Sequence, residues 1–133
     1  AYYYTQSSVI PYRVRDGKPE ILVIASSKKH HLVVPKGIKD PGLSPRESAA
    51  KEALEEAGIE GEVADTALGS YTCEKWGATC TVSVYPMKVT RLIAEQDWEE
   101  SHRGREWVSP EKAARELKQR ELAPLVKQLE AMF

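Results

Sequence analysis

The stretch SPRESAAKEALEEAG, from Ser44 to Gly58, decides how the middle of the chain folds. Ser44 is a favoured N-cap residue, Pro45 fits the first helical position, and Glu47 stands where a capping box needs it. Gly58 stands where a left-handed residue commonly ends a helix. The sequence therefore predicts a helix over residues 45–57.

This helix has an apolar side and an acidic side. The apolar residues follow the i, i+3, i+4, i+7 spacing of a buried stripe: Ala50, Ala53, Leu54 and Ala57. The acidic residues follow i, i+3, i+4 spacing beside it: Glu52, Glu55 and Glu56. Like charges at this spacing destabilise a helix, and a divalent cation would turn that repulsion into coordination. The alternative is a solvated acidic face that Lys51 partly neutralises.

A loop rich in glycine and proline precedes the helix. It contains Pro35-Lys36-Gly37 and Asp40-Pro41-Gly42, and the exposed backbone of such a loop can approach a phosphate or a metal ion closely. Such a loop directly before an acidic helix is a much rarer combination than the neighbouring charges alone. The combination therefore favours a site for a metal ion and a phosphorylated ligand.

Residues 37–59 resemble the Nudix box, written G-x5-E-x7-R-E-U-x-E-E-x-G-U with U for an aliphatic residue. Every spacing of the box is met, and the three helix glutamates are present. Leu43 stands at the first glutamate position, Lys51 at the arginine position, and the small Ala53 at an aliphatic position. Lys51 keeps the positive charge but loses the two-pronged geometry of arginine. We expect metal binding to survive, with rate and metal preference left open.

The resemblance implies a divalent metal cofactor, Mg²⁺ with Mn²⁺ as an alternative. It implies that Glu52 and Glu56 are the main metal ligands, and that Glu55 is a further ligand or the general base. It also implies that the backbone carbonyl of Lys36 contacts the metal. Outside candidates for the base are Glu99 and Glu100.

A second, looser resemblance lies in the C-terminal half. Asp97-Trp98-Glu99-Glu100 and Gly104-Arg105-Glu106-Trp107, followed by a predicted helix, are similar to the end of diphosphoinositol polyphosphate phosphohydrolases. That branch of the Nudix family also includes enzymes that act on diadenosine polyphosphates. The resemblance implies a densely phosphorylated small molecule as substrate.

Several basic residues are candidate phosphate contacts. The donor-rich segment Ser26-Ser27-Lys28-Lys29-His30-His31 could cradle a polyanion, although a solvated surface loop is an equally good interpretation. The resemblance to the phosphohydrolases favours three residues: Lys28, Lys75 and Arg105. The further candidates are Arg13, Lys36 and Arg103. No metal site is predicted at the two histidines, because neighbouring side chains of a strand point to opposite faces.

The segments around the helix read mainly as strands. Residues 8–15 and 20–25 form a predicted hairpin with its turn at Asp16-Gly17. Further strands are predicted over residues 31–34, 62–73, 78–89 and 105–108, and two helices follow Ser109-Pro110. This order predicts an α/β (α+β) fold, and the family resemblance implies an α/β/α sandwich with a mixed central sheet over the single domain 1–133.

Composition narrows the classes of function. The chain has 133 residues and 41% hydrophobic residues, enough for one core, and its net charge of -1 makes nucleic acid an improbable partner. Cys73 and Cys80 are too few for a disulfide framework, and no leader-like segment is seen, so we expect a reducing, cytoplasmic setting. No apolar run is long enough to span a bilayer. The tryptophans are predicted to pack rather than to stack on a base: Trp76, Trp98 and Trp107.

The leading functional prediction is a Mg²⁺-dependent phosphohydrolase that cleaves a phosphoanhydride bond in a diphosphoinositol polyphosphate or a diadenosine polyphosphate. One alternative is a pyrophosphatase for nucleoside triphosphates or nucleotide sugars, and an RNA-end hydrolase stays open. Another is a non-catalytic module that binds a phosphorylated ligand, which the changes at Leu43 and Lys51 make worth keeping. The sequence leaves the oligomeric state and the number of metal ions open.

Overall fold

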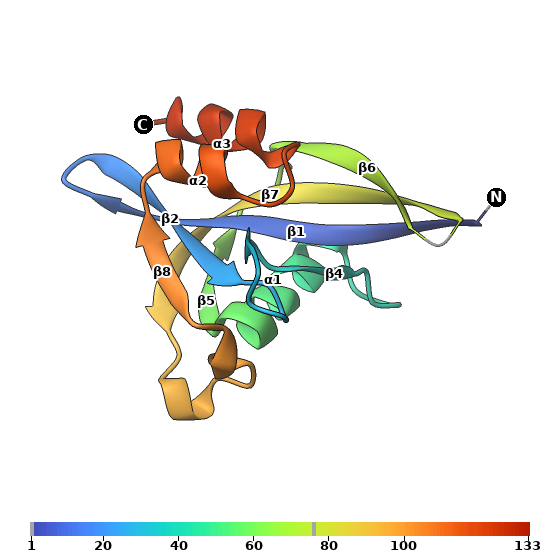
Figure 1. Cartoon of the computed structure of the whole chain (residues 1–133), viewed down its shortest axis with the longest axis horizontal. Helices are drawn as coiled ribbons and strands as arrows, with labels where there is room; N and C mark the ends of the chain where they lie inside the picture. Colours follow the sequence, from blue (N-terminus) through green and yellow to red (C-terminus); the bar gives the residue numbers. More distant parts are fainter. Residues whose placement is uncertain (1, 76) are drawn as a thin grey trace.

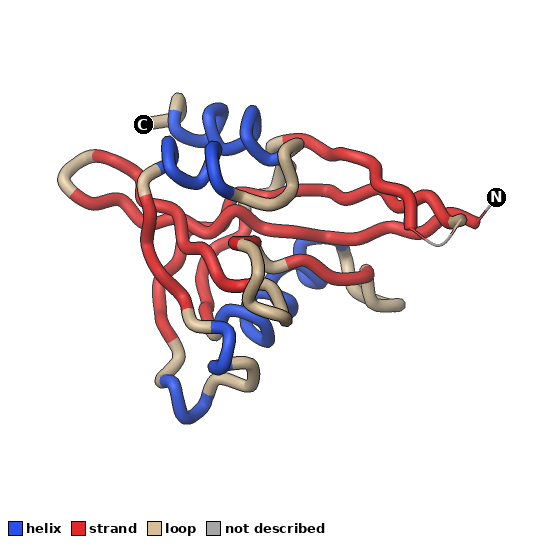
Figure 2. Tube along the Cα trace, viewed as in Figure 1, coloured by secondary structure: helices blue, strands red, loops and turns tan. Residues whose placement is uncertain are grey.

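The computed structural model describes residues 2–75 and 77–133, and for Tyr2 and Lys75 the backbone alone. Within this part, eight strands form one mixed sheet at the centre of the molecule (Figures 1 and 2). Five strands lie in the order β3 (Leu32–Val33), β2 (Lys18–Ala25), β1 (Tyr2–Arg15), β7 (Ala78–Leu92) and β5 (Ile59–Val63). The others are β4 (Lys36–Ile38) on β1, β6 (Gly69–Lys75) on β7, and β8 (Arg105–Val108) on β2. β1 and β7 are parallel, and the remaining pairs are antiparallel.

Helices cover both faces of this sheet (Figure 1). α1 (Pro45–Ala57) lies on one face, and α2 (Pro110–Glu116) and α3 (Leu122–Glu130) lie on the other. One apolar core includes Ile10 and Leu129, and the second includes Val9 and Ala53. The neighbours Val9 and Ile10 belong to different cores because successive side chains of a strand point to opposite faces. The predicted α/β/α sandwich with a mixed sheet is confirmed.

The predicted limits of α1 are confirmed by its caps. Ser44 Oγ accepts from the Glu47 N–H at 3.1 Å, and Glu47 Oε1 accepts from the Ser44 N–H at 2.8 Å. Gly58 ends the helix with φ 63°. The predicted apolar stripe was wrong in one member, because Leu54 is 41% exposed. The buried stripe instead runs at four-residue spacing through Ala49, Ala53 and Ala57, whose small side chains let the helix lie close to the sheet.

The strand predictions needed three corrections. The strand predicted over residues 8–15 begins at Tyr2, because residues 2–7 also pair with β7. The single strand predicted over residues 62–73 is broken into β5 and β6, which follow one another along β7. The Ala64 and Leu68 N–H groups bond to Pro86 and Val84 of β7 on either side of the break. The segment Lys36–Ile38, expected as loop, forms β4 because it pairs with β1. The hairpin turn at Asp16-Gly17 is confirmed, with φ 53° and 76° at its two residues.

Two short 3₁₀ turns, η1 (Glu95–Asp97) and η2 (Ser101–Arg103), connect β7 to β8. Within the described residues, no helix has the length and apolar character needed to cross a membrane.

Candidate active site

β4 and the last turn of α1 meet at Glu56. The Lys36 N–H donates to Glu56 Oε1 at 3.1 Å. Lys36 is held in place because it pairs with Ser8 of β1, and the buried Ser8 hydroxyl donates to the carbonyl of Pro35 at 2.8 Å. At the other end of the loop, the buried Ser48 hydroxyl accepts from the Asp40 N–H at 3.1 Å. The glycine- and proline-rich loop is therefore fixed to both the sheet and the helix.

Glu52 lies against β4 one turn before Glu56. A Cβ atom on Gly37 would overlap the carboxyl group of Glu52. Gly37 has no left-handed φ, so the need for glycine here is a need for space. The two carboxyl groups also interact with each other, which lowers the pKa of Glu52 and raises the pKa of Glu56. Glu52 and Glu56 thus form a pair of carboxyl groups, the acid pair, against the backbone of β4.

Burial controls the ionisation of the acid pair. The pKa of Glu56 is raised to about 7, mainly by burial and also by the charge of Glu52, while the Lys36 N–H and Arg103 oppose the rise. Burial also raises the pKa of Glu52, and the charges of Glu55 and Asp40 add to that rise. Two half-buried carboxyl groups in contact cannot both ionise easily without a neighbouring cation.

These features fit a divalent metal ion. Mg²⁺ prefers one or two carboxylates together with water and substrate phosphate, and the acid pair supplies two carboxylates in contact. Among the described residues, no group of three or more His, Cys, Asp or Glu side chains gathers closely enough to form a metal site by itself. The structure therefore brings Glu52, Glu56 and Lys36 together, while Glu55 as a third ligand stays a prediction. The role of the Lys36 carbonyl also stays a prediction.

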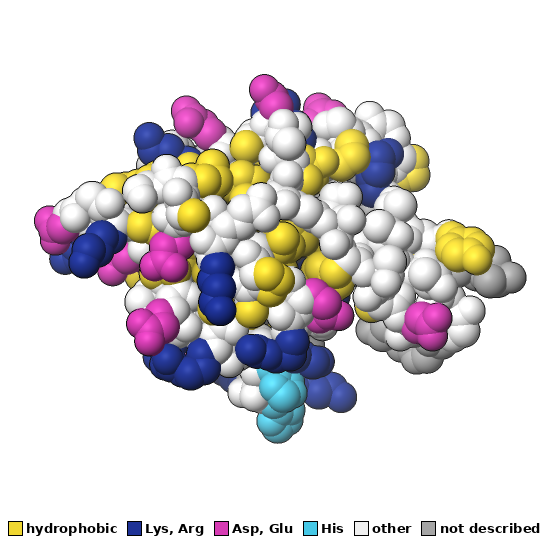
Figure 3. All heavy atoms as spheres, turned by 90° about the horizontal axis from the view of Figure 1, so that it is seen from above, with side chains coloured by type: hydrophobic (Ala, Val, Ile, Leu, Met, Phe, Trp, Pro, Cys, Tyr) yellow, Lys and Arg dark blue, Asp and Glu magenta, His cyan; other side chains and the backbone are white. Residues whose placement is uncertain are grey.

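A pocket of about 340 Å³ opens beside Glu56. It has three cationic residues, Lys36, Arg103 and Lys118, and the neutral residue Gln119. Its hydroxyl groups come from Ser8, Ser26, Ser27 and Tyr71. Cations and hydroxyl donors around one carboxylate are suited to a phosphorylated ligand. In the space-filling view, Lys and Arg side chains gather beside the exposed histidines (Figure 3).

Some of the predicted phosphate contacts lie at the pocket beside Glu56, and others lie away from it. The segment 26–31 forms a turn, in which the Ser26 N–H donates to the carbonyl of His31 at 2.8 Å. This turn brings Ser26 and Ser27 to the pocket and leaves Lys28 exposed and outside its lining. Lys36 lines the pocket, and its contact with phosphate stays a prediction. The side chain of Lys75, and all of Trp76, lie outside the described residues.

Two other predicted contacts are engaged elsewhere. Arg13 Nε donates to Glu20 at 2.8 Å, and its guanidinium lies 4.3 Å from the ring centre of Trp107. Arg105 donates to backbone carbonyls at the end of α1 and does not line the pocket beside Glu56. Phosphate binding by Arg13 and Arg105 stays a prediction. Of the outside candidates for the base, Glu100 accepts from Arg103 Nε at 2.9 Å.

Tertiary contacts bring in residues that the sequence did not single out. Leu117 forms a β-bridge with Leu32, and the Lys118 N–H donates to the carbonyl of Leu32 at 3.0 Å. This contact carries Lys118 and Gln119 to the pocket. Arg103, which sequence reasoning ranked as a further candidate, is held there because Nη1 donates to the carbonyl of Ala25 at 3.2 Å. Nothing in the local sequence pattern distinguishes Lys118 from other surface lysines.

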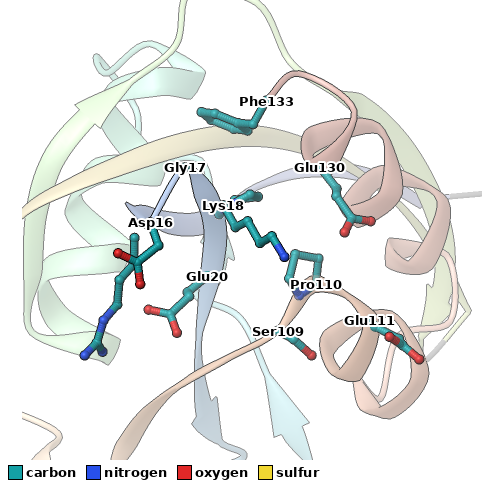
Figure 4. Close-up of a pocket in the computed structure, with 11 residues that line it drawn as sticks. Asp16, Gly17, Lys18, Glu20, Ser109, Pro110, Glu111, Glu130 and Phe133 are labelled. Atoms are coloured by element: carbon teal, nitrogen blue, oxygen red, sulfur yellow. The ribbon is translucent and has the colours of Figure 1, made fainter.

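A larger hollow of about 900 Å³ lies between the β1–β2 hairpin and the C-terminal helices (Figure 4). Lys18 and Glu130 approach it from opposite sides, and Glu20, Glu111 and Phe133 also line it. Its charges are mixed, and none of the α1 glutamates reaches it. It therefore lacks the chemistry of the acid pair.

Comparison with known proteins places the chain in a family. The family model of the NUDIX domain matches residues 5–129. Nudix hydrolase 12, mitochondrial, of Arabidopsis thaliana is 30% identical over 129 residues, covering 80% of this chain and 63% of the relative. Diphosphoinositol polyphosphate phosphohydrolase 2 of Rattus norvegicus is 34% identical over 102 residues, covering 74% of this chain and 54% of the relative. A solved Ap4A hydrolase of C. elegans superposes with a TM-score of 0.77 at 26% identity, covering 98% of both chains.

The chain therefore belongs to the Nudix hydrolase family. The rat and nematode relatives are named for the two kinds of enzyme in the branch that the sequence resembles. The chain spans 63% and 54% of the lengths of the Arabidopsis and rat relatives.

Proposed function

We propose that the chain is a Mg²⁺-dependent hydrolase that cleaves a phosphoanhydride bond in a densely phosphorylated small molecule. A diphosphoinositol polyphosphate or a diadenosine polyphosphate is the substrate class we favour. The observation that carries the proposal is the acid pair, of which Glu56 lines a pocket that Lys36, Arg103 and Lys118 also line. Hydrolysis of a phosphoanhydride requires charge neutralisation and positioning, and this combination supplies both.

In this proposal Glu52 and Glu56 hold Mg²⁺ or Mn²⁺, with the carbonyl of Lys36 as a further contact. When bound, the ion supplies Lewis-acid polarisation of the phosphate oxygens. Arg103 and Lys118 hold the charged oxygens of the substrate and orient it toward the acid pair. Glu55 is our first candidate to take the proton of the attacking water. A small-molecule substrate in a reducing, cytoplasmic setting completes the proposal.

Phosphate release from a substrate panel tests this proposal. The panel contains diphosphoinositol polyphosphates, diadenosine polyphosphates, nucleoside triphosphates and nucleotide sugars, each with Mg²⁺. We expect the highest kcat/KM on one of the first two classes. A clear preference for triphosphates or nucleotide sugars would instead support the pyrophosphatase alternative.

A non-catalytic binding module is the second candidate function. Lys51 stands at the arginine position of the Nudix box, and its Nζ donates to Asp40 at 2.8 Å. Lys51 is therefore paired with the loop before α1. Tight binding of a panel member without any phosphate release would favour this candidate.

Replacing Lys118 with alanine should weaken substrate binding more than it slows the chemical step. Loss of one charge-assisted contact to a phosphate corresponds to roughly a tenfold rise in KM, with a smaller change in kcat. Steady-state kinetics measure both values. Lys127→Ala is the matched control, since Lys127 is an exposed lysine of α3 that lines a different hollow. Equal effects of the two variants would contradict a role for Lys118 in the pocket.

A further inference from the structure

The guanidinium group of Arg105 closes the C-terminal end of α1. Its Nη1 donates to the carbonyls of Ala57 at 3.0 Å and Gly58 at 2.9 Å. Its Nη2 donates to the carbonyl of Ile93 at 2.6 Å, just before η1. The last carbonyls of a helix have no partner within the helix and carry a partial negative charge. One side chain of β8 therefore satisfies these carbonyls and ties them to the segment that follows β7.

Trp98 holds this guanidinium from the other side. The Arg105 guanidinium lies 4.6 Å from the centre of the Trp98 ring, and Trp98 is only 5% exposed. Within the described part of the chain, Trp98 Nε1 is the buried side-chain nitrogen or oxygen atom that lacks a hydrogen-bond partner. A buried N–H without a hydrogen-bond partner costs free energy of folding. Trp98 therefore contributes here through the face of its ring, on which the arginine stacks.

Gly58 leaves room for this arrangement. A Cβ atom at Gly58 would lie 2.7 Å from Arg105 Nη1 and 2.6 Å from Trp98 Cγ. Gly58 is thus needed for its left-handed φ and also for the close approach of both side chains. β8 is itself fixed, because Arg105 pairs with Ile24 of β2.

We propose that Arg105 is a positioning residue that, stacked on Trp98, fixes the last turn of α1 and so sets Glu56 against Lys36 for metal binding. The inference rests on the proposed function, because it concerns the placement of a metal-binding carboxylate. Glu56 immediately precedes Ala57, whose carbonyl accepts from Arg105, and Glu56 itself accepts from Lys36. Arg105 therefore acts on the site through the helix backbone.

The test compares Arg105→Gln and Arg105→Lys with wild type. Mg²⁺ affinity is measured by calorimetry without substrate, and kcat and KM are measured at saturating Mg²⁺. Loss of an outer support of a metal ligand typically costs about 10- to 100-fold in affinity or activity. We expect that loss in Mg²⁺ affinity and kcat for both variants, with KM unchanged. Lysine should not rescue, because it cannot bond to three carbonyls and stack on a ring at once.

Arg91→Gln is the control. Arg91 is an arginine of β7 that pairs with Glu60 at 2.6 Å, and the variant should keep wild-type metal affinity. A raised KM with unchanged Mg²⁺ affinity, rescued by lysine, would overturn the inference and make Arg105 a phosphate contact. A lower Tm with unchanged Mg²⁺ affinity and kcat would reduce Arg105 to a structural role. If Arg105→Gln does not fold, Arg105→Lys alone tests the inference. If the wild type turns over no substrate, the Mg²⁺ titration still tests it.

Discussion

Replacing Glu56 with glutamine should reduce phosphate release by about a thousandfold or more, because several kcal/mol of metal-dependent stabilisation of the transition state would be lost. Glutamine has nearly the size and shape of glutamic acid but carries no charge. Its amide oxygen can accept from the Lys36 N–H, as Glu56 does, and its amide group can donate to Glu52. The fold should therefore be kept while the negative charge is lost.

Three measurements make this prediction specific. Phosphate release gives kcat, calorimetry gives Mg²⁺ affinity, and thermal unfolding in EDTA gives the stability of the metal-free protein. We expect the first two to fall sharply and the Tm in EDTA to stay at or above the wild-type value, because a buried acid is removed. Glu62→Gln, at an exposed glutamate of β5, is the control. Near-normal turnover by Glu56→Gln would show that the acid pair is not the catalytic metal site.

Replacing Gly37 with alanine should reduce activity by about 100-fold, the scale expected when a reacting group is displaced by roughly an ångström. The added Cβ would overlap the carboxyl group of Glu52, which is the far end of a flexible side chain. Glu52 can move aside, so the free energy of unfolding should change little. The displaced carboxylate, however, should no longer lie beside Glu56.

Gly69→Ala is the matched control for this variant. Its Cβ would also meet only a movable side-chain end, Leu125 Cδ2 at 2.9 Å, on the face of the sheet away from α1. Both variants should show similar small changes in Tm, and only Gly37→Ala should lose Mg²⁺ affinity. A large fall in the Tm of Gly37→Ala that accounts for its loss of activity would contradict the claim that Gly37 is needed to leave space for Glu52.

Features that depend on neighbours in the sequence were the ones that could be predicted. The limits of α1 are an example, because Ser44, Glu47 and Gly58 fix both ends through local hydrogen bonds and backbone conformation. The turn at Asp16-Gly17 is another. The acid pair also follows from helix spacing, because residues four apart share one side of a helix.

Features that depend on distant contacts could not be predicted. Leu54 fits an apolar stripe by spacing, yet the sheet contacts the alanines on a neighbouring line of α1. Lys118 reaches the pocket through the bridge between Leu117 and Leu32, far apart in the sequence. The sequence shows that Arg105 is charged but not that three backbone carbonyls occupy its guanidinium.

The central claim is that Glu52 and Glu56 form a metal-dependent hydrolytic site, and metal removal tests it most directly. Wild-type protein is assayed for phosphate release from a diphosphoinositol polyphosphate and a diadenosine polyphosphate with Mg²⁺, after EDTA, and after Mg²⁺ or Mn²⁺ is restored. We predict turnover of at least one substrate with Mg²⁺, its loss in EDTA, and its recovery with either ion. Turnover that persists in EDTA, or binding of both compounds without phosphate release under any condition, would contradict the claim.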